Sequence, residues 1–554
     1  MGKMNTAQEV TIACEKLRGF WRRRNEKFAR WYKIVQMVDE LAQANMESFV
    51  GNDPRAAFNL LLSMLEQKIP HRLPPEELSL EQTAPAAELS RMFEAAWDSI
   101  FNQYRRRGRY FLRDLIGLLL ATGWYSVFSI ISADGSRCIA EVWNPATVFP
   151  SWDDDLVECA HIVQLSEMQA RRMIARNDWA VRPPTRPVTV YDHWRLDGDN
   201  RVYNSIVIDS TLVKDNVWET RFNRIPIFIA PVGGLPDTGE LSRADTWKEE
   251  LGQSVLATNE NIYRYWNKWW TFSLQLLRDT VQARTFEKST SGRQIVKPED
   301  WAKRGGHFKM GPQDEVGFIH PPPIPMELRS AQLDMEAMMQ RGGPSWSMFG
   351  TVTQQMTSYM MSQVAASVSQ NTKPYHQGII DCFTDIDNFW LYLIRENKYR
   401  PYGKGLPSGL PKNARIIADY ELRIPGDLIQ RVTTARIMNP AFELSDEKIM
   451  EELFPEIKNP AEEIAKVRAG KARRHPIYAS IALAESFRAE AELLRKAKDD
   501  RAAGLYEKAA DLVEASLTIA PKGETPATGG VRPPSARPEV IPPPSGGEMT
   551  QGAR

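Results

Sequence analysis

Residues 242–280 read SRADTWKEELGQSVLATNENIYRYWNKWWTFSLQLLRDT, and residues 325–350 read PMELRSAQLDMEAMMQRGGPSWSMFG. In the first segment apolar side chains recur every three or four residues, which predicts one helix that begins at Ser242 and ends at about Thr280. The second segment predicts a helix from Pro325, a favourable first-turn residue, to the glycine pair at 342–343. Between the two lies a short Gly/Pro-rich insert with β-like character. The sequence is therefore organised around two helices, an insert that joins them, and a glycine-bracketed loop that follows.

Length and composition limit the class of protein. A chain of 554 residues is too long for a single core and should divide into two to four regions. Lys plus Arg and Asp plus Glu both number 70, so the net charge is zero. This balance argues against a protein that grips nucleic acid over its whole surface, although it leaves room for a local contact.

Cysteines and apolar runs indicate the compartment. The four cysteines show no CxxC pattern, so we expect buried thiols in a reducing environment. The first ten residues contain no apolar signal core, and the longest apolar run, Leu115–Ala121, is far shorter than the ~20 residues of a membrane helix. We therefore expect a cytosolic protein without membrane spans.

The N-terminal part predicts helices followed by strands. Residues 6–122 are mainly helical in pattern, with helices at 53–69 and 87–122. From Gly123 onward the apolar period changes to that of strands with short turns, which predicts a mostly antiparallel β-rich module. The strands expected there are 124–131, 137–143, 158–165, 188–196, 202–208 and 225–230, with a short helix capped by Ser166.

The C-terminal part returns to helices. Segments 352–370 and 374–397 predict helices that are consecutive or bent at Pro374, and a strand follows near 414–423. Further helices are expected at 446–453, 460–472, 477–498 and 501–519, and the last two should form a hairpin. Residues 521–554 are rich in proline and glycine, which predicts a disordered tail.

One cluster of acidic residues in the sequence could support catalysis. Asp153, Asp154 and Asp155, with Glu158 nearby, could hold Mg²⁺ for a nucleic-acid-processing enzyme. Consecutive acids on a turn point in different directions, however, and turns favour aspartate for their own reasons. Phosphate-binding, hydrolase, zinc-protease and calcium-loop motifs are absent. We therefore expect no catalytic residue, no metal site and no cofactor, and keep the Asp153/Asp154/Glu158 enzyme as the alternative.

Three stretches resemble the portal proteins, or head–tail connectors, of tailed bacteriophages. The first is EVWNPATVFP at 141–150, followed by Trp152-Asp153-Asp154. The second is RIPI at 224–227, which leads into a Gly/Pro turn and a long helix, and the third is PPPIP at 321–325, which leads into the second helix and its Gly-Gly-Pro loop. The resemblance covers about residues 20–520 and depends on the order of the elements more than on one motif.

This resemblance implies an α+β, mainly helical fold with wing, stem, clip and crown regions, assembled as a ring of usually twelve copies. The implied regions are the N-terminal wing 1–241, stem helix 242–280, clip 281–324, stem helix 325–341, tunnel loop 342–357, the wing's long helix and returning strand 358–425, the helical crown 426–520 and the tail 521–554.

The resemblance also implies a function and partners. The ring would be the channel at one capsid vertex through which double-stranded DNA is packaged and ejected, in the virion and, during assembly, in the host cytoplasm. Its partners would be the terminase large subunit, head–tail adaptor and tail proteins, and the major capsid and scaffolding proteins. A helical adaptor whose C-terminal hairpin binds a partner peptide is a further alternative.

Candidate residues follow from that picture. A conduit along which DNA slides cannot accumulate many phosphate contacts, because each one adds affinity. The candidates for the channel and tunnel loop are accordingly few and mostly uncharged: Arg329, Arg341, Ser345, Trp346, Ser347, Gln354 and Gln355. The aromatics nearly all round the first stem helix need burial on several sides, which neighbouring copies would provide. The candidates for this subunit interface are Tyr263, Trp266, Trp269 and Trp270.

Overall fold

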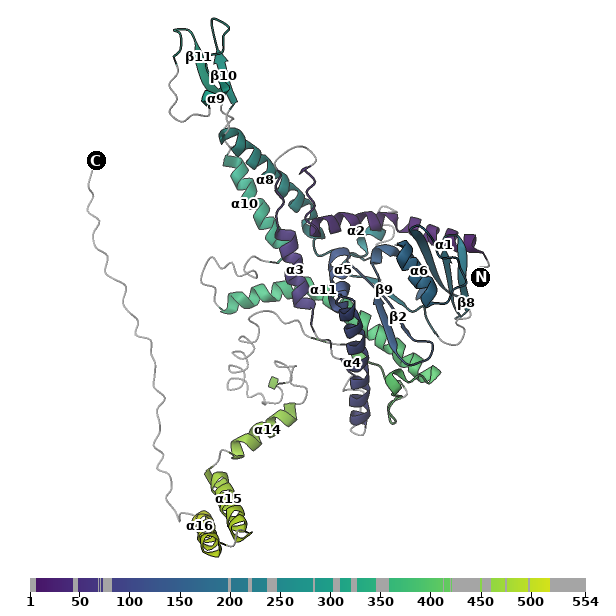
Figure 1. The fold of residues 1–554 in the computed structure, drawn as a ribbon, viewed down its shortest axis with the longest axis vertical. Helices are drawn as coiled ribbons and strands as arrows, with labels where there is room; N and C mark the ends of the chain where they lie inside the picture. The colour runs from purple at the N-terminus through teal and green to yellow at the C-terminus, as the bar shows by residue number, and fades with distance from the viewer. Residues whose placement is uncertain are drawn as a thin grey trace, which may run out of the picture. The chain divides into compact units, whose positions relative to one another are not determined.

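The computed structural model describes residues 6–42, 48–67, 69, 71–72, 82–197, 201–217, 222–236, 247–281, 284–301, 309–319, 326–344, 358–411, 413–418, 420, 449–450, 460–473, 476–496 and 499–518. The chain divides into two compact units, Met1–Val432 and Thr433–Arg554. The fold is mixed α and β with more helix than strand, as expected (Figure 1). In these ranges no helix is both long and apolar enough to cross a membrane. All four cysteines are buried free thiols, which confirms the sequence prediction.

Helices form most of the first 122 residues. They are α1 (Ala7–Phe20), α2 (Arg22–Val35), α3 (Asp53–Leu65), α4 (Thr83–Arg106) and α5 (Phe111–Thr122). The prediction of a single helix over 87–122 is wrong, because the chain turns between α4, which ends at Arg106, and α5, which begins at Phe111. Gly108 has φ +70°, a left-handed conformation that glycine adopts without strain and that ends a helix.

Two antiparallel sheets follow. In one, β2 (Trp124–Ile131) lies between β3 (Cys138–Val142) and β9 (Ile227–Pro231). The other has the order β4-β5-β6-β7-β8, with bounds Val148–Trp152, Leu156–Leu165, Val188–Leu196, Val202–Ile208 and Thr211–Val217. Predicted strands 124–131, 188–196 and 202–208 have the observed bounds. β4 and β8, absent from the prediction, are edge strands, and β4 tolerates Pro150 because an edge strand need not donate every amide.

Two short elements connect these strands. The 3₁₀ turn η4 (Pro145–Thr147) precedes β4, and Asn144 caps it by accepting a hydrogen bond from Ala146 N. Helix α6 (Glu167–Arg176) begins with a reciprocal cap between Ser166 and Gln169, as the sequence predicts.

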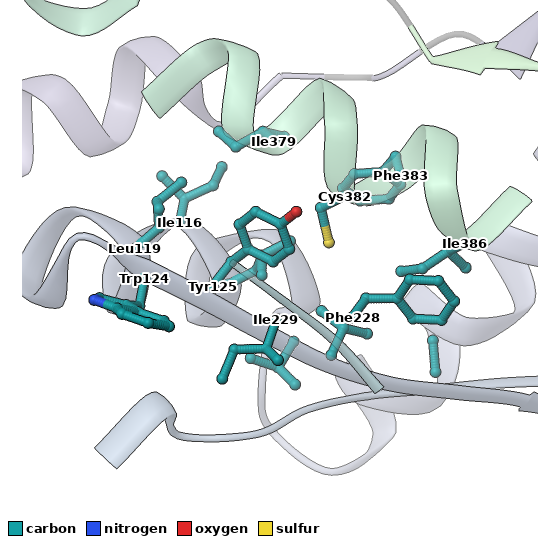
Figure 2. Close-up of a cluster of buried hydrophobic side chains, with 14 of the residues drawn as sticks. Ile116, Leu119, Trp124, Tyr125, Phe228, Ile229, Ile379, Cys382, Phe383 and Ile386 are labelled. Atoms are coloured by element: carbon teal, nitrogen blue, oxygen red, sulfur yellow. The ribbon is translucent and has the colours of Figure 1, made fainter. Parts of the chain in front are cut away.

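The main core lies where α5 and α11 (Ser358–Asn397) pack on the β3-β2-β9 sheet. Figure 2 shows apolar side chains of α11 opposite those of α5, β2 and β9, among them Ile379, Phe383 and Ile386 of α11. These three are at most 1% exposed and form an apolar stripe along this helix that packs into the core. The sequence left open whether this segment forms two consecutive helices or one helix that contains Pro374. The structure has one continuous helix through Pro374.

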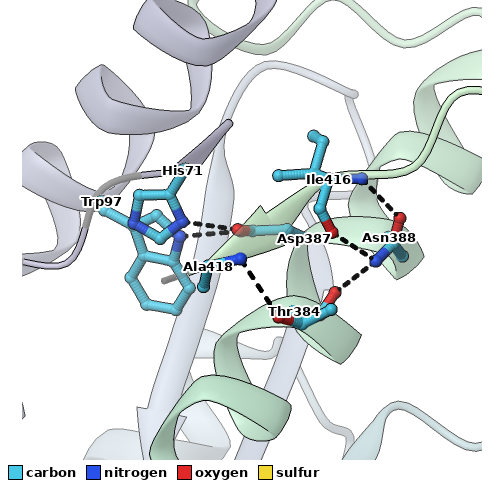
Figure 3. A network of polar contacts seen from close by, with 7 residues as sticks. All are labelled: His71, Trp97, Thr384, Asp387, Asn388, Ile416 and Ala418. Carbon is cyan, nitrogen blue, oxygen red and sulfur yellow. Dashed lines mark hydrogen bonds and ion pairs between the residues drawn. The ribbon is translucent and has the colours of Figure 1, made fainter. Parts of the chain in front are cut away.

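A second anchor of α11 is polar. The two-residue strands β1 (His71–Arg72) and β12 (Ile417–Ala418) pair with each other beside it. Asn388 of α11 donates its amide to Ile416 O at 2.9 Å, and its carbonyl accepts from Ile416 N at 3.0 Å (Figure 3). Of the described residues in the strand predicted near 414–423, only Ile417 and Ala418 form a strand, and they pair with β1.

Asp387 lies at the centre of that network. Its carboxylate is fully buried and accepts from His71 Nδ1 at 2.5 Å and from Trp97 Nε1 at 2.8 Å (Figure 3). Three segments distant in sequence, β1, α4 and α11, are therefore joined through one side chain.

The helix predicted from Ser242 to about Thr280 is not continuous. Residues 247–281 form α7 (Trp247–Glu250), the 3₁₀ turn η6 (Ala257–Asn259) and α8 (Glu260–Val281). Between them the backbone pairs with distant segments, since Gln253 N donates to Val232 O and Val255 N donates to Leu120 O, both at 3.0 Å. Gly252 lies against the Trp124 indole, where a Cβ would be 2.3 Å from Nε1. These tertiary contacts outweigh the helical pattern.

The insert and the second helix follow α8. The insert contains β10 (Arg284–Lys288), α9 (Pro298–Trp301) and β11 (Glu315–Ile319), and β10 pairs antiparallel with β11. Helix α10 (Met326–Arg341) ends at the predicted residue. In Figure 1, α8 and α10 run side by side and lead to the β10–β11 hairpin.

The remaining elements are helical. The 3₁₀ turn η8 (Pro401–Gly403) follows α11. The second unit contains α14 (Pro460–Arg473), α15 (Pro476–Lys496) and α16 (Asp500–Thr518), and α15 and α16 form the predicted hairpin. Of the helix predicted at 446–453 only residues 449–450 are described, and the predicted tail 521–554 lies outside the described residues.

Candidate interface on the α8–α10 helix pair

The base of the helix pair is fixed by Asn259. This side chain is 1% exposed, and its Nδ2 donates to Met339 O of α10 at 2.9 Å. That carbonyl is among the last four of α10, which lack partners within the helix. Gly342 fits tightly here, because a Cβ at that position would lie 2.1 Å from Asn259 Oδ1. Gly342 is therefore required by its close contact with Asn259, the residue immediately before α8.

One side of α8 is buried within the chain itself. Tyr263 and Trp266 are 6% and 7% exposed. The segment before α3 packs on this helix, since Phe49 N donates to Thr271 Oγ1 at 3.0 Å and Gly51 N donates to Asn267 Oδ1 at 2.9 Å. Gly51 also lies against the Trp266 ring, whereas Tyr263 OH accepts a hydrogen bond from Asn259. Tyr263 and Trp266 are thus buried within the single chain, and their assignment to a subunit interface stays a prediction.

Trp269 and Trp270 are half-buried and form one aromatic cluster with Trp266. Their rings contact each other edge to face at 5.0 Å, and Trp270 also contacts Phe49 at 5.6 Å. Both indole N–H groups are buried without a hydrogen-bond partner among the described residues. Their assignment to a subunit interface stays a prediction.

The other side of α8 is apolar and exposed. Tyr265 and Phe272 are 62% and 58% exposed, and lie seven residues apart on the side opposite Tyr263. Further along, Leu277 and Val281 are 49% and 84% exposed, but they follow Tyr263 by 14 and 18 residues and so lie on its side of the helix. On α10, Leu333 and Met338 are 60% and 50% exposed. We name the exposed residues of these two helices the outer stem face: Tyr265, Phe272, Leu277, Val281, Leu333 and Met338.

Two of the channel candidates lie on α10. Arg329 and Arg341 are both exposed. Arg341 lines a cavity of about 220 Å³ between the end of α10 and α11, together with Thr258, Asn371 and Thr372. The other candidates, Ser345, Trp346, Ser347, Gln354 and Gln355, lie outside the described residues, so the structure does not bring the proposed channel set together.

Two carboxylates of the insert, Asp314 and Glu287, accept hydrogen bonds from backbone amides of its loops. Asp314 accepts hydrogen bonds from Thr290 N and Gly311 N, both at 3.0 Å, and these amides lower the pKa of its carboxyl. Glu287 accepts from Ile295 N at 2.9 Å and from Val296 N at 3.2 Å. The hairpin β10–β11 is thereby tied to the loops on both of its ends, which suits a small module at the end of a helix pair.

The carboxylates of the alternative enzyme are dispersed. Glu158 accepts from His193 Nε2 at 2.7 Å, and this hydrogen bond lowers the pKa of Glu158. Asp155 accepts from Leu156 N and lies 3.6 Å from Arg224. Among the described residues no group of three or more His, Cys, Asp or Glu side chains is placed to hold a metal ion.

The sequence did not predict three features of this region: the contact of Asn259, the contact of Gly342, and the outer stem face. The glycine pair at 342–343 was a visible signal of a tight junction, but nothing local marks Asn259 as its partner. The i, i+7 spacing of Tyr265 and Phe272 was also visible, yet it did not separate the exposed aromatics from the buried ones.

Comparison with known proteins gives structural likenesses only. No protein-family model and no curated protein matches the sequence. A chain from "Neck of empty GTA particle computed with C6 symmetry" is similar at 11% identity and a TM-score of 0.38, over 75% of this chain and 92% of that one. Chains from "Neck of native GTA particle computed with C12 symmetry" and "Virion of native gene transfer agent (GTA) particle" are similar at 11% and 12% identity, with TM-scores of 0.36 and 0.37. They cover 73% of this chain in both cases, and 90% and 89% of the respective matched chains. The chain is thus distantly similar in structure to chains of gene transfer agent particles.

Proposed function

We propose that this protein is a portal, a ring of identical chains whose central channel lets double-stranded DNA enter and leave a phage-like particle. The observation that carries the proposal is the outer stem face. Outside its buried side the helix pair exposes six large apolar side chains, of which Tyr265 and Phe272 share one side of α8 and Leu277 and Val281 lie on another. Exposed apolar surface of this extent is typical of an interaction site.

A ring accounts for this surface better than a single partner. In a ring each copy uses two different faces, one for each neighbour, and the contacts close on themselves. Full burial of a large apolar side chain contributes about 1.5–3 kcal/mol, and Tyr265, Phe272 and Val281 are 62%, 58% and 84% exposed, so covering these three would contribute about 3–6 kcal/mol before the entropic cost of association. That is enough to matter for assembly and small enough to depend on concentration or on other capsid proteins.

The roles of the regions follow from the proposal. The pair α8–α10 is the stem around the channel, and residues 281–324 are the clip that docks the terminase motor and then the tail adaptors. Residues 1–241 and 358–425 form the wing, and 426–520 the crown, which meet the major capsid and scaffolding proteins. The protein is not an enzyme, because a separate motor hydrolyses ATP. Arg329 and Arg341 are the only cations that we place near the DNA, which keeps the contact weak enough for sliding.

Electron microscopy of variants tests the proposal. Phe272→Glu places a charge in the outer stem face and should abolish rings, because a buried unpaired charge is costly. Arg278→Glu, on the same helix but away from Phe272, is the matched control and should leave rings intact. Both residues are exposed, so neither variant should alter the thermal unfolding of the single chain. Rings that persist in Phe272→Glu at the wild-type yield would refute the role of this face.

A further inference from the structure

The turn between α4 and α5 carries an exposed cluster of arginines. Residues 105–110 read RRRGRY, and all six are exposed. The chain as a whole has equal numbers of cationic and anionic side chains, so four arginines in six positions are a local surplus of positive charge. We name residues 105–110 the arginine turn.

Only part of this charge is neutralised within the chain. Arg107 lies 3.7 Å from Glu141, and Arg109 lies 2.9 Å from Asp114. The other two arginines of the turn form no ion pair with any residue that the structure describes. The side chains of both pairs are 27–56% exposed, and exposed ion pairs contribute only about 0–1 kcal/mol. Another anion can therefore replace these carboxylates at little cost.

The arginine side chains are not needed to end the helix. Cationic side chains near a helix C-terminus often bond to its last carbonyls. Here the backbone does so itself. Tyr104 O accepts from the amides of residues 107 and 109 at 2.9 and 3.0 Å, and Arg105 O accepts from Gly108 N at 2.9 Å. Among the described residues no guanidinium of the turn donates to a main-chain oxygen, so the four side chains extend into solvent without a capping role.

The base of the turn is anchored, and its outer side is open. Tyr104 is 4% exposed, and its hydroxyl accepts a hydrogen bond from Val142 N of β3 at 2.8 Å. The guanidinium carbons of Arg107 and Arg109 lie 6.0 and 5.8 Å from the centre of the Tyr104 ring. At Gly108 a Cβ would meet no atom within 4 Å. The arginines are therefore presented from a fixed base toward unobstructed solvent.

The chemistry of the turn fits a phosphate backbone better than a protein surface. Protein–protein interfaces have an apolar centre, and residues 105–110 contain no aliphatic side chain. Guanidinium groups bind phosphate through two parallel hydrogen bonds, and the hydroxyl of Tyr110, which is 56% exposed, adds a further donor. All four cations are arginines and none is a lysine, a choice typical of nucleic-acid recognition.

We propose that the arginine turn binds the phosphate backbone of double-stranded DNA outside the channel. Arg329 and Arg341 are the cations assigned to the channel, where the duplex must slide. Four arginines on each copy release more counterions and hold a duplex more strongly, so the arginine turn suits stationary DNA. The inference goes beyond the proposed portal and does not require a ring, because a single copy already carries the whole turn.

Salt-dependent DNA binding of the full-length protein tests this site. The probe is a fluorescein-labelled duplex of about 30 base pairs, and its anisotropy gives the binding constant between about 50 and 200 mM salt. Each phosphate contact adds about 0.9 to the slope of log K against log salt, so Arg105→Ala/Arg106→Ala should lower that slope by about 2. Across this range the affinity of the variant should therefore fall about tenfold less than that of the wild type. Arg105→Lys/Arg106→Lys keeps the charge and should keep the slope.

The matched control is Arg488→Ala/Arg495→Ala. These two arginines are also exposed, and each lies 2.8 Å from a glutamate. The control thus removes the same charge from cations that are already paired, and it should leave the slope unchanged. All four replaced side chains are exposed, so neither alanine variant should alter the thermal unfolding of the protein.

The outcomes separate the arginine turn from the portal. A slope that stays at the wild-type value in Arg105→Ala/Arg106→Ala, or that falls equally in the control, would overturn the site. A lysine variant with the slope of the alanine variant would also overturn it, because charge sets the slope. Weaker binding of poly-glutamate at unchanged duplex binding would overturn it in favour of an acidic protein partner.

Electron microscopy of the same preparations completes the test. Rings whose duplex binding does not depend on the arginine turn would overturn this inference and leave the portal in place. Duplex binding that does depend on the turn, in particles that have no central hole, would support the inference and refute the portal.

Discussion

Replacing Asp387 by asparagine should destabilise the first unit by about 3–5 kcal/mol. The carboxylate is fully buried and accepts from two donors, His71 Nδ1 at 2.5 Å and Trp97 Nε1 at 2.8 Å. An asparagine has one oxygen, so its NH₂ group must face one of these donors. Loss of a hydrogen bond to a charged group costs about 1.5–3 kcal/mol, and a buried donor left unpaired costs about 1–3 kcal/mol more. Removing one partner of a buried polar pair costs a similar total.

Denaturant unfolding measures this effect. The midpoint of a guanidinium titration, followed by tryptophan fluorescence, should shift to lower concentration with an unchanged slope. Asp381→Asn is the matched control, because that carboxylate lies on the exposed side of the same helix and accepts from Gln377 at 2.8 Å. It should change the free energy of unfolding by less than about 0.5 kcal/mol.

A double-mutant cycle measures the coupling free energy between Asp387 and Trp97. Trp97→Phe removes the indole donor and keeps an aromatic ring, so Asp387→Asn should cost less in that background, with a coupling of about 0.5–3 kcal/mol. Asp387→Asn that behaves like the surface control, or costs that add in the double variant, would show that Asp387 does not hold β1, α4 and α11 together.

Two further changes test other contacts of the fold. Gly252→Val should destabilise the first unit by about 1–3 kcal/mol, because a side chain there meets the Trp124 indole; Gly19→Ala, with no neighbouring atom within 4 Å, should instead stabilise it by about 0.5–1 kcal/mol in the same titration. Glu158→Gln should flatten the acid dependence of stability. The His193 hydrogen bond lowers the pKa of Glu158 below its ordinary 4.5, so its stabilisation is complete above that pH and is lost as the pH falls through the folded-state pKa. Titrations at pH 7 and at about pH 3 measure this difference, and equal losses in wild type and variant would contradict it.

Local turn chemistry explains why the strands were predictable. The turn after β2 contains Gly135 at φ +71°, and Asp134 accepts from Ser136 N, so a few adjacent residues specify the hairpin. The apolar stripe of α11 was equally readable, because its period depends on one helix. Such features need no knowledge of the rest of the chain.

Errors arose where distant segments compete with a local pattern. Residues 251–256 carry helical spacing, but their amides bond to Leu120 and Val232, more than a hundred and about twenty residues away. Burial of Trp266 depends on residues near Gly51, more than two hundred positions earlier. The break at Gly108 is different, because that glycine was visible in the sequence and could have ended the predicted helix.

The surroundings of α8 could be predicted only in part. Aromatic density over residues 263–272 predicts a helix that needs contacts on several sides, and the structure shows the contacts to residues 49–51. Which side the chain covers for itself depends on the segment at 49–51, and that segment has no signature as a partner of α8. Tyr265 and Phe272 are therefore exposed on α8, whereas Tyr263 and Trp266 are buried within the chain.

Electron microscopy of the purified full-length protein at high concentration tests the central claim most directly. The portal account predicts class averages with rotational symmetry and a central hole, in which the α8–α10 pairs of adjacent copies stand side by side. Compact single copies without a hole, both in such preparations and in assembled particles, would contradict it.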